Sequence, residues 1–301
     1  MKLKNNILKI LKKCFRTKWT IGFVEVQLVD AINPEYNLNV HWLQHDFRGR
    51  WFADPFVLEV NDTDIILLVE EYYDPIHRGR ISRMIVDRKS YKIKSLNAVL
   101  TLPTHLSFPA IKRINGRFLI YPESGASGEL TLYDYNVKTN ICQPLMNICD
   151  GPLADAILTD VFGEQMIFAT EVPQHNGDTL NVYKENPDGK YYKSNQIKFD
   201  GMVARNAGDW FKIGDSVYRP AQDCNKTYGG AVIIQKVVAK GDEFVFTDIR
   251  RISSSNMLYN EGCHTFNYYK GILVLDAKGY RFPGFVKIWR KISTLKKMLK
   301  R

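Results

Sequence analysis

One pattern recurs five times along the chain and restricts its fold more than any other feature. In each unit, a strand that starts at a polar residue is followed by a turn and by an apolar strand that ends on a polar residue. The units start at intervals of roughly 45 to 60 residues, near Trp51, His105, Ala154, Ala204 and Gly262. A period of this length is typical of the four-stranded blades of a β-propeller.

Further strands follow the hairpin in the first four units, at 79–86, 129–135, 179–183 and 230–236. The fifth unit lacks a strand, and residues 20–28 alternate in hydrophobicity as a strand does. Adding them to the last unit closes the ring and removes an exposed sheet edge. The sequence therefore predicts an all-β, five-bladed β-propeller over residues 20–284, with a two-sheet sandwich as the alternative.

Basic residues gather at both ends of the chain. Residues 1–18 and 285–301 each carry seven lysines and arginines and no acid. The whole chain carries +10, so residues 19–284 carry −4. A mildly acidic body does not favour nucleic-acid binding, and we predict no nucleic-acid partner.

The apolar residues of both ends recur at helical spacing, as Phe285, Ile288 and Ile292 do. We therefore predict basic amphipathic segments at 1–19 and 285–301 that lie on an anionic membrane surface. The alternative is that their apolar stripes dock on the protein itself.

The chain has no apolar run near its start, and none of the ~18–20 residues that a membrane-spanning helix needs. Its five cysteines are an odd number without a CxxC pair, which favours reduced thiols over disulfides or a zinc cluster. The sequence thus predicts a cytoplasmic protein, peripheral on the inner face of the membrane.

Polar residues occupy the two ends of each predicted hairpin that lie on the same side. In a propeller, these ends converge on one mouth of the central channel. The predicted groups are Asp54 with Glu71, Ser107 with Glu123, Asp155 with Glu171, Arg205 with Gln222 and Asp223, and His264 with Asp276. Carboxylates accept hydrogen bonds from sugar hydroxyls, and a neutral acid facing an ionised base can catalyse glycosyl chemistry. We therefore expect a carbohydrate site at this mouth.

Some of these residues allow a structural explanation instead. Asp54 precedes Pro55 and can be a turn-forming cap, and His264 can be a hydrogen-bonded histidine of an inner strand. Arg219, near the end of the fourth hairpin, can clamp a carboxylate or phosphate, or it can pair with Asp223.

No motif predicts a metal or a cofactor. Asp62-Thr63-Asp64 matches the DxD string of metal-dependent glycosyltransferases, but it falls at a hairpin turn opposite the predicted mouth. The histidines lack HExxH spacing, and the glycines at 125–128 are not followed by the Lys-Ser/Thr of a P-loop.

Seven strings of the sequence together resemble a known family. They are Phe52-Ala53-Asp54-Pro55-Phe56, Val69-Glu70-Glu71-Tyr72, His105-Leu106-Ser107-Phe108-Pro109, Pro122-Glu123-Ser124, Ala154-Asp155-Ala156, Ala204-Arg205-Asn206-Ala207-Gly208 and Arg219-Pro220-Ala221-Gln222-Asp223. In this order they resemble the N-terminal propeller domain of glucosamine inositolphosphorylceramide transferases. Bacterial stand-alone relatives of that domain are associated with surface-polysaccharide synthesis. The resemblance covers roughly residues 20–280 and implies a role in building a cell-surface glycan.

That domain is in turn similar to five-bladed furanosidase-type glycoside hydrolases. In these, an early Asp is the base or nucleophile, a middle Asp tunes the pKa and a later Glu is the acid. The resemblance implies Asp54 for the first role and Asp155 for the second, and leaves Glu123 and Glu171 as candidates for the acid. The predicted catalytic residues are Asp54, Glu123 and Asp155. The residues predicted to bind substrate are Glu71, His105, Glu171, Arg205, Arg219, Gln222, Asp223 and His264.

Three functions fit these features. The first is a glycosyltransferase-like enzyme that acts on a sugar nucleotide or a lipid-linked sugar, favoured by the basic ends and the missing signal peptide. The second is a furanosidase-type hydrolase, favoured by the fold resemblance but not by a cytoplasmic location or by the unassigned acid. The third is a non-catalytic sugar-binding module.

Overall fold

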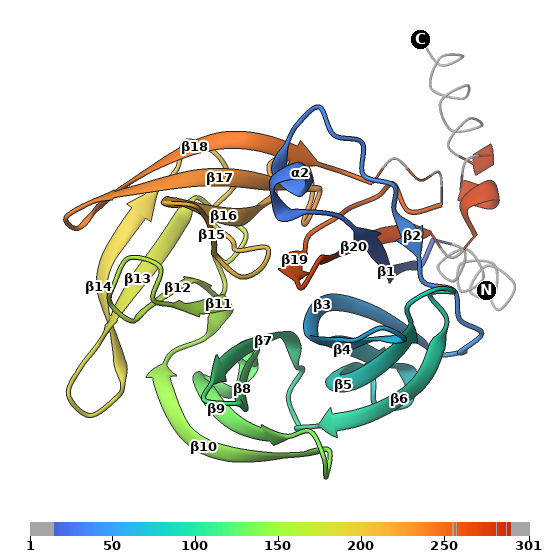
Figure 1. Cartoon of the computed structure of the whole chain (residues 1–301), viewed down its shortest axis with the longest axis horizontal. Helices are drawn as coiled ribbons and strands as arrows, with labels where there is room; N and C mark the ends of the chain where they lie inside the picture. The colour runs from blue at the N-terminus through green and yellow to red at the C-terminus, as the bar shows by residue number, and fades with distance from the viewer. Residues whose placement is uncertain (1–14, 255, 257, 281, 287, 290–301) are drawn as a thin grey trace, which may run out of the picture.

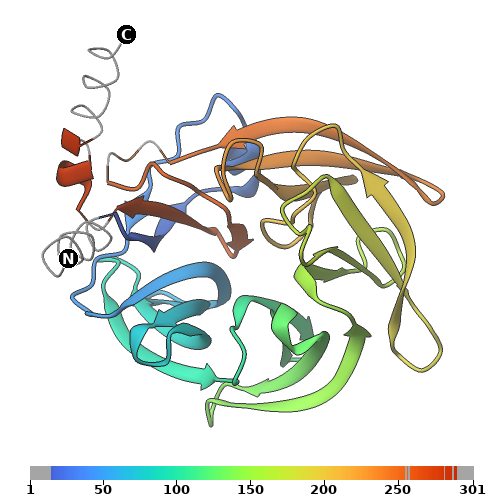
Figure 2. The same ribbon diagram turned by 180° about the vertical axis from the view of Figure 1, so that it is seen from behind.

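The computed structural model describes residues 15–254, 256, 258–280, 282–286 and 288–289 of the chain. Five four-stranded antiparallel sheets stand around a ring, with the first strand of each blade nearest the centre (Figure 1). The same ring is seen from behind in Figure 2. The predicted all-β, five-bladed propeller is confirmed.

The strands of the first four blades follow one another outward in chain order. Blade one contains β3 (Arg50–Val60), β4 (Asp64–Tyr73), β5 (Arg78–Asp87) and β6 (Ile93–Leu100). Blade two contains β7 (Ser107–Ile114), β8 (Arg117–Glu123), β9 (Glu129–Asn136) and β10 (Ile141–Asp150). Blade three contains β11 (Leu153–Thr159), β12 (Met166–Glu171), β13 (Thr179–Glu185) and β14 (Tyr191–Lys198). Blade four contains β15 (Phe211–Ile213), β16 (Ser216–Asp223), β17 (Ala231–Lys240) and β18 (Glu243–Ile252).

Blade five joins the two ends of the chain. Its strands are, from the centre outward, β19 (Phe266–Tyr269), β20 (Ile272–Tyr280), β1 (Thr17–Glu25) and β2 (His41–Trp42). β1 pairs antiparallel with β20 over nine residues, from Thr17 opposite Tyr280 to Glu25 opposite Ile272. The predicted closure is therefore present, although β1 starts within the segment predicted at 1–19 and ends at Glu25.

Helical elements among the described residues are short. α2 (Leu28–Ile32) lies between β1 and β2, and the single 3-10 turns η1 (Asp74–Ile76) and η2 (Gly125–Ser127) follow β4 and β8. None of the described helices is long and apolar enough to cross a membrane.

Aromatic and aliphatic side chains fill the spaces between neighbouring blades. The rings of Phe56 and Phe108 meet edge to face at 4.9 Å and join blade one to blade two. Phe168 stacks on Trp210 at 4.2 Å, which packs blade three against the entry to blade four. These contacts fix the angle between blades and hence the positions of the innermost strands.

Most of the predicted terminal segments lie outside the described residues, which exclude 1–14, 287 and 290–301. Residues 283–286 and 288–289 are helical and lie on the outer side of blade five (Figure 1). The ring of Phe15 contacts those of Phe285 and Trp289 at 5.9 and 4.9 Å. Apolar residues from the two ends of the chain therefore touch each other.

Candidate functional site

Blades one, two and three share an irregularity in their innermost strand. The β3–β4, β7–β8 and β11–β12 registers each shift near the mouth, immediately after Ala53, Ser107 and Ala154. The residues that follow, Asp54, Phe108 and Asp155, have φ angles of 48°, 44° and 44°. A non-glycine residue in this left-handed region is strained by roughly 1–3 kcal/mol, and such strain clusters at functional sites.

Each of these three bulges turns its backbone N–H toward a carboxylate of the preceding blade. Asp54 N donates to Asp276 Oδ2 of blade five at 3.1 Å. Phe108 N donates to Asp54 Oδ2 of blade one at 3.1 Å. Asp155 N donates to Glu123 Oε2 of blade two at 3.0 Å. Asp276, Asp54 and Glu123 thus form a carboxylate relay around the channel mouth.

Arg205 links the relay to blade three. Its Nε donates to Asp155 Oδ2 at 2.5 Å, and its Nη2 donates to Glu123 Oε2 at 3.1 Å. Gln222 Nε2 also donates to Asp155 Oδ2, at 2.5 Å, and Asn176 Oδ1 accepts from Arg205 Nη1 at 2.9 Å. The Arg205 side chain is only 6% exposed, so its charge is neutralised inside the protein by the two carboxylates.

His264 stands between the other two members of the relay. Its Nδ1 lies 2.6 Å from Asp276 Oδ2, and its Nε2 lies 3.5 Å from Asp54 Oδ1. The indole of Trp19 stacks on the imidazole with 3.9 Å between ring centroids, and Tyr228 meets it edge-on. β1 and β20 therefore position this histidine jointly.

The pKa values of the buried cluster diverge. Burial raises the pKa of Asp54 well above its usual range, since the charge of His264 offsets only part of that effect. Burial would lower the pKa of His264, but the charges of Asp276 and Asp54 outweigh it and raise the pKa to about 9. Burial also favours the neutral form of Asp276, yet the charge of His264 holds its pKa below the usual value. Burial thus favours the neutral form of Asp54, while their mutual attraction favours the charged forms of His264 and Asp276.

The pKa of Asp155 is also shifted by its surroundings. Burial raises its pKa to about 7, with the charge of Arg205 opposing the rise and that of Glu123 adding to it. This carboxyl can therefore gain or lose a proton near neutral pH.

The rim of the mouth is more open than its floor. Asp54 and Asp155 are 5% and 2% exposed, whereas the side chains of Glu123 and His105 are 15% and 47% exposed. His105 Nε2 lies 3.1 Å from Glu70 Oε1. Burial lowers the pKa of His105, but its contact with Glu70 and the charge of Glu123 raise it above the usual value. Glu123 and His105 are therefore the more accessible side chains of the mouth.

The structure brings seven of the eleven predicted site residues to this mouth. They are Asp54, His105, Glu123, Asp155, Arg205, Gln222 and His264.

Four predicted site residues lie elsewhere. Glu71 is fully buried among Arg50, Arg80 and Ser82, because successive strand residues face opposite sides and Glu70 takes the side of His105. Glu171 accepts from Tyr183 and pairs with Lys193, away from the relay.

Arg219 and Asp223 are not partners of each other. Arg219 is fully buried and donates to Asn206, Gln235 and the carbonyl of Ala204, so it neither reaches the mouth nor pairs with Asp223. Asp223 instead accepts from Arg251 at 2.9 Å. These two residues hold blade four together.

Several residues of the site were not predicted from the sequence. Trp19, Glu70, Asn176 and Tyr228 come from separate strands and loops and share no spacing with the repeat. Asp276 is predicted at the mouth together with His264, but it is not among the residues predicted to catalyse or to bind substrate.

The described residues include one group with metal-ligand geometry, which sequence spacing did not reveal. Donor atoms of Asp54, His264 and Asp276 all lie within 4.8 Å of one another. In this structure the imidazole of His264 itself stands between the two carboxyl groups. The DxD string at Asp62–Asp64 forms the β3–β4 turn, as predicted, and Asp64 pairs there with Lys94 at 2.6 Å.

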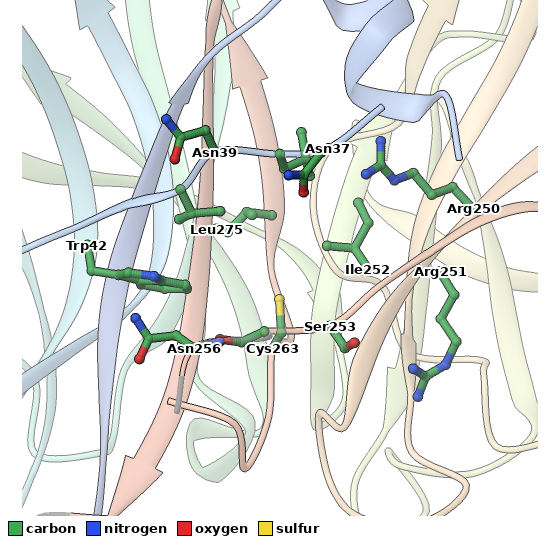
Figure 3. A pocket seen from close by; sticks show the side chains of 13 residues that line it. Asn37, Asn39, Trp42, Arg250, Arg251, Ile252, Ser253, Asn256, Cys263 and Leu275 are labelled. Carbon is green, nitrogen blue, oxygen red and sulfur yellow. The ribbon is translucent and has the colours of Figure 1, made fainter. Parts of the chain in front are cut away.

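A separate polar cavity of about 460 Å³ opens between blades four and five (Figure 3). Trp42 and Asn256 lie on one side of it, and Arg250 and Ile252 on the other (Figure 3). Arg250 donates to the carbonyls of the loop around α2, which shapes the cavity wall. This cavity contains no residue of the relay.

Comparison with known proteins identifies the family. The model of the N-terminal region of glucosamine inositolphosphorylceramide transferase 1 matches residues 38–261. The chain belongs to this family. Glucosamine inositolphosphorylceramide transferase 1 of Oryza sativa subsp. japonica is 28% identical over 204 residues, which are 64% of this chain and 27% of that protein. The Arabidopsis thaliana transferase of the same name is 28% identical over 202 residues, which are 63% and 26%. The chain thus spans about a quarter of the length of these curated relatives.

Solved structures with the same architecture belong to glycoside hydrolases of the GH43 type, as the resemblance implies. The GH43_1 enzyme of Xanthomonas citri superposes with a TM-score of 0.50 at 10% identity, covering 76% of this chain and 87% of that one. The GH43B enzyme of the Bacteroides ovatus xyloglucan PUL gives 0.50 at 13% identity, covering 75% and 46%. At these identities the likeness shows the fold that the transferase family shares with them.

Proposed function

We propose that this protein is a glycosyltransferase-like enzyme of cell-surface glycan biosynthesis, acting on an activated or lipid-linked sugar at the inner face of the membrane. The observation that carries the proposal is the carboxylate relay. Together with Asp155, it places carboxyl groups of different pKa at one mouth: burial raises the pKa of Asp54, the charge of His264 lowers that of Asp276, and the pKa of Asp155 is about 7. Carboxyl groups whose pKa values are driven apart are the usual arrangement for acid–base chemistry at a glycosidic centre.

Two acceptor groups of the site suit a polyhydroxylated ligand. Glu123 Oε2 is held by Asp155 N and Arg205, which fixes the carboxylate while part of it stays exposed. The buried Oε1 of Gln222 has no hydrogen-bond partner among the described residues. A sugar hydroxyl donates readily to such an acceptor, and an unpaired buried acceptor otherwise destabilises the fold by roughly 1–3 kcal/mol.

The relatives support sugar transfer, since their names describe transferases. The reaction is therefore proposed at the level of glycosyl transfer, and the sugar and the acceptor are open to experiment.

The first test is a thermal-shift screen against sugar nucleotides, lipid-linked sugars and free glycans. We expect an activated sugar to raise the melting temperature of the wild type but not of Asp54→Asn or Glu123→Gln. Glu171→Gln is the matched control, because Glu171 lies outside the relay. With the stabilising sugar as donor, product formation should fall at least about a hundredfold in the two relay variants, as for loss of a general acid or base. Full turnover in both would contradict the proposed site.

A non-catalytic sugar-binding module is the second candidate, favoured by the burial of Asp54 and Asp155 at the floor of the mouth. It predicts saturable binding of a finished glycan without turnover. Hydrolysis of that glycan would instead identify a furanosidase-type hydrolase.

A further inference from the structure

A second cavity, of about 190 Å³, lies on the mouth side of the ring where blade five meets blade one. Its walls come from the starts of β1 and β3, the loop before β3 and the residue after β4. The ionisable residues of its lining are Arg16, Lys18, His45, Arg48, Arg50 and Asp74. None of these residues belongs to the relay.

The cavity carries an excess of positive charge. Arg16 pairs with Asp74 at 2.6 Å, and Arg50 pairs with Glu71 at 2.7 Å. Within the part of the chain that the structure describes, neither Lys18 nor Arg48 pairs with a carboxylate. Two cations therefore face this cavity without a counter-ion.

Buried donors in the cavity also lack partners. The guanidinium of Arg50 lies over the rings of Phe47 and Tyr73, at 5.0 and 4.7 Å, and its Nε has no hydrogen-bond acceptor among the described residues. The buried Nδ1 of His45 likewise has none. Burial and the charge of Lys18 lower the pKa of His45 to about 4, so its ring is neutral and has one N–H to donate. An anion with several acceptor oxygens offers the kind of partner that these donors and the two cations lack.

An exposed apolar cluster adjoins this cavity. Phe15, next to Arg16, packs against Phe285 and Trp289. Phe285, Trp289 and the neighbouring Ile288 are 39%, 45% and 62% exposed. Aromatic residues beside basic ones are the composition that membrane interfaces favour.

We propose that this cavity binds the phosphate group of a membrane lipid while Phe285, Ile288 and Trp289 enter the headgroup layer. The phosphate supplies the missing counter-ion for Lys18 and Arg48 and accepts from the unpartnered donors. The apolar cluster selects a lipid over a soluble phosphate, because a soluble ligand gains nothing from exposed rings. The inference rests on the proposed membrane location but not on the proposed reaction.

The test measures binding of the full chain to phosphatidylcholine vesicles with and without phosphatidylinositol. The pocket variant is Lys18→Ala with Arg48→Ala. The matched control is Lys138→Ala with Lys190→Ala, which removes the same charge from exposed positions of blades two and three. At ~1 kcal/mol for each cation near an anionic surface, the pocket variant should bind the phosphatidylinositol vesicles about thirtyfold more weakly. The control should stay within about twofold of the wild type.

A second variant, Ile288→Ser with Trp289→Ser, tests the apolar cluster. It should weaken vesicle binding even at high salt, where the charge contribution is screened. Equal losses in the pocket and control variants, or no vesicle binding by the wild type, would overturn the proposal. Loss of UDP-glucose binding in the pocket variant with vesicle binding intact would assign the cavity to a soluble phosphate instead. Turnover is measured separately, so an inactive protein that binds vesicles in this way leaves the lipid site standing.

Discussion

His264 Nδ1 lies 2.6 Å from Asp276 Oδ2, and both side chains are sealed from solvent by Trp19 and the surrounding blades. This pair links blade five, in which the ring closes, to the residues of the channel mouth. The two residues belong to blade five, whereas the carboxyl group of Asp54, on the other side of the imidazole, belongs to blade one.

The pair predicts a pH dependence of stability. The pKa of His264 rises from 6.5 to about 9 on folding, so its contribution is complete below pH 6.5 and is lost as the pH passes 9. A shift of this size corresponds to about 3 kcal/mol. We expect the difference in unfolding free energy between wild type and His264→Gln to narrow from pH 6 to pH 10, as measured by urea denaturation. A constant difference across this range would contradict the ion pair.

The Arg205 site predicts a large difference between a buried and an exposed arginine. Arg205→Met leaves Asp155 and Glu123 without their shared cation and should destabilise the protein by about 3 kcal/mol. Arg251→Met removes an ion pair whose arginine is 52% exposed and should cost at most about 1 kcal/mol. Chemical denaturation of both variants measures the contrast, and equal losses would be inconsistent with a buried Arg205.

The bulge at Asp54 predicts a side-chain preference set by the backbone. Asn is tolerated at positive φ, whereas a β-branched residue is not. Asp54→Val should therefore be less stable than Asp54→Ala by roughly 1–2 kcal/mol, while Asp54→Asn stays nearest the wild type. Asp54→Ala is the control, because it also lacks the carboxylate that accepts the hydrogen bond from Phe108 N. Thermal and urea unfolding rank the three, and a valine variant as stable as the alanine one would show that the backbone relaxes.

The contact between His105 and Glu70 at the rim predicts that the pKa of His105 changes when Glu70 is neutralised. The contact with Glu70 raises the pKa of His105, so Glu70→Gln should lower that pKa toward or below its usual value. The adjacent Glu71→Gln faces the other side of β4 and should leave the titration of His105 nearly unchanged. NMR titration of the histidine ring protons distinguishes the two. A lowered pKa in both variants would indicate a general rearrangement of the blade.

Strand order and ring closure could be predicted because they follow from local signals. Alternating apolar residues, turn residues and a missing last strand are all visible in the sequence, and they led to the pairing of β1 with β20. The same logic brought Asp54, Asp155 and His264 to one mouth, since the ends of antiparallel hairpins must coincide.

The site predictions that the structure contradicts depend on which face of a strand a single residue occupies. Glu70 and Glu71 are adjacent and face opposite sides of β4, and the register shifts immediately after their partners Ala53 and Phe52. A bulge leaves no mark in the hydrophobic pattern of the opposing strand, so the sequence could not show which glutamate contacts His105. The prediction for Arg219 was wrong for a related reason. From β16 its side chain points between blades, where it donates to Asn206 and Gln235.

The pairing of β1 with β20 also sets the order in which parts of the fold can form during synthesis. Asp54 and Trp19 leave the ribosome early, but Asp276 and His264 must be added before either acquires its partner. Four blades can form progressively during translation, whereas the mouth stays open at one side until β20 is available. A chain interrupted before Asp276 therefore has neither a closed ring nor a complete relay.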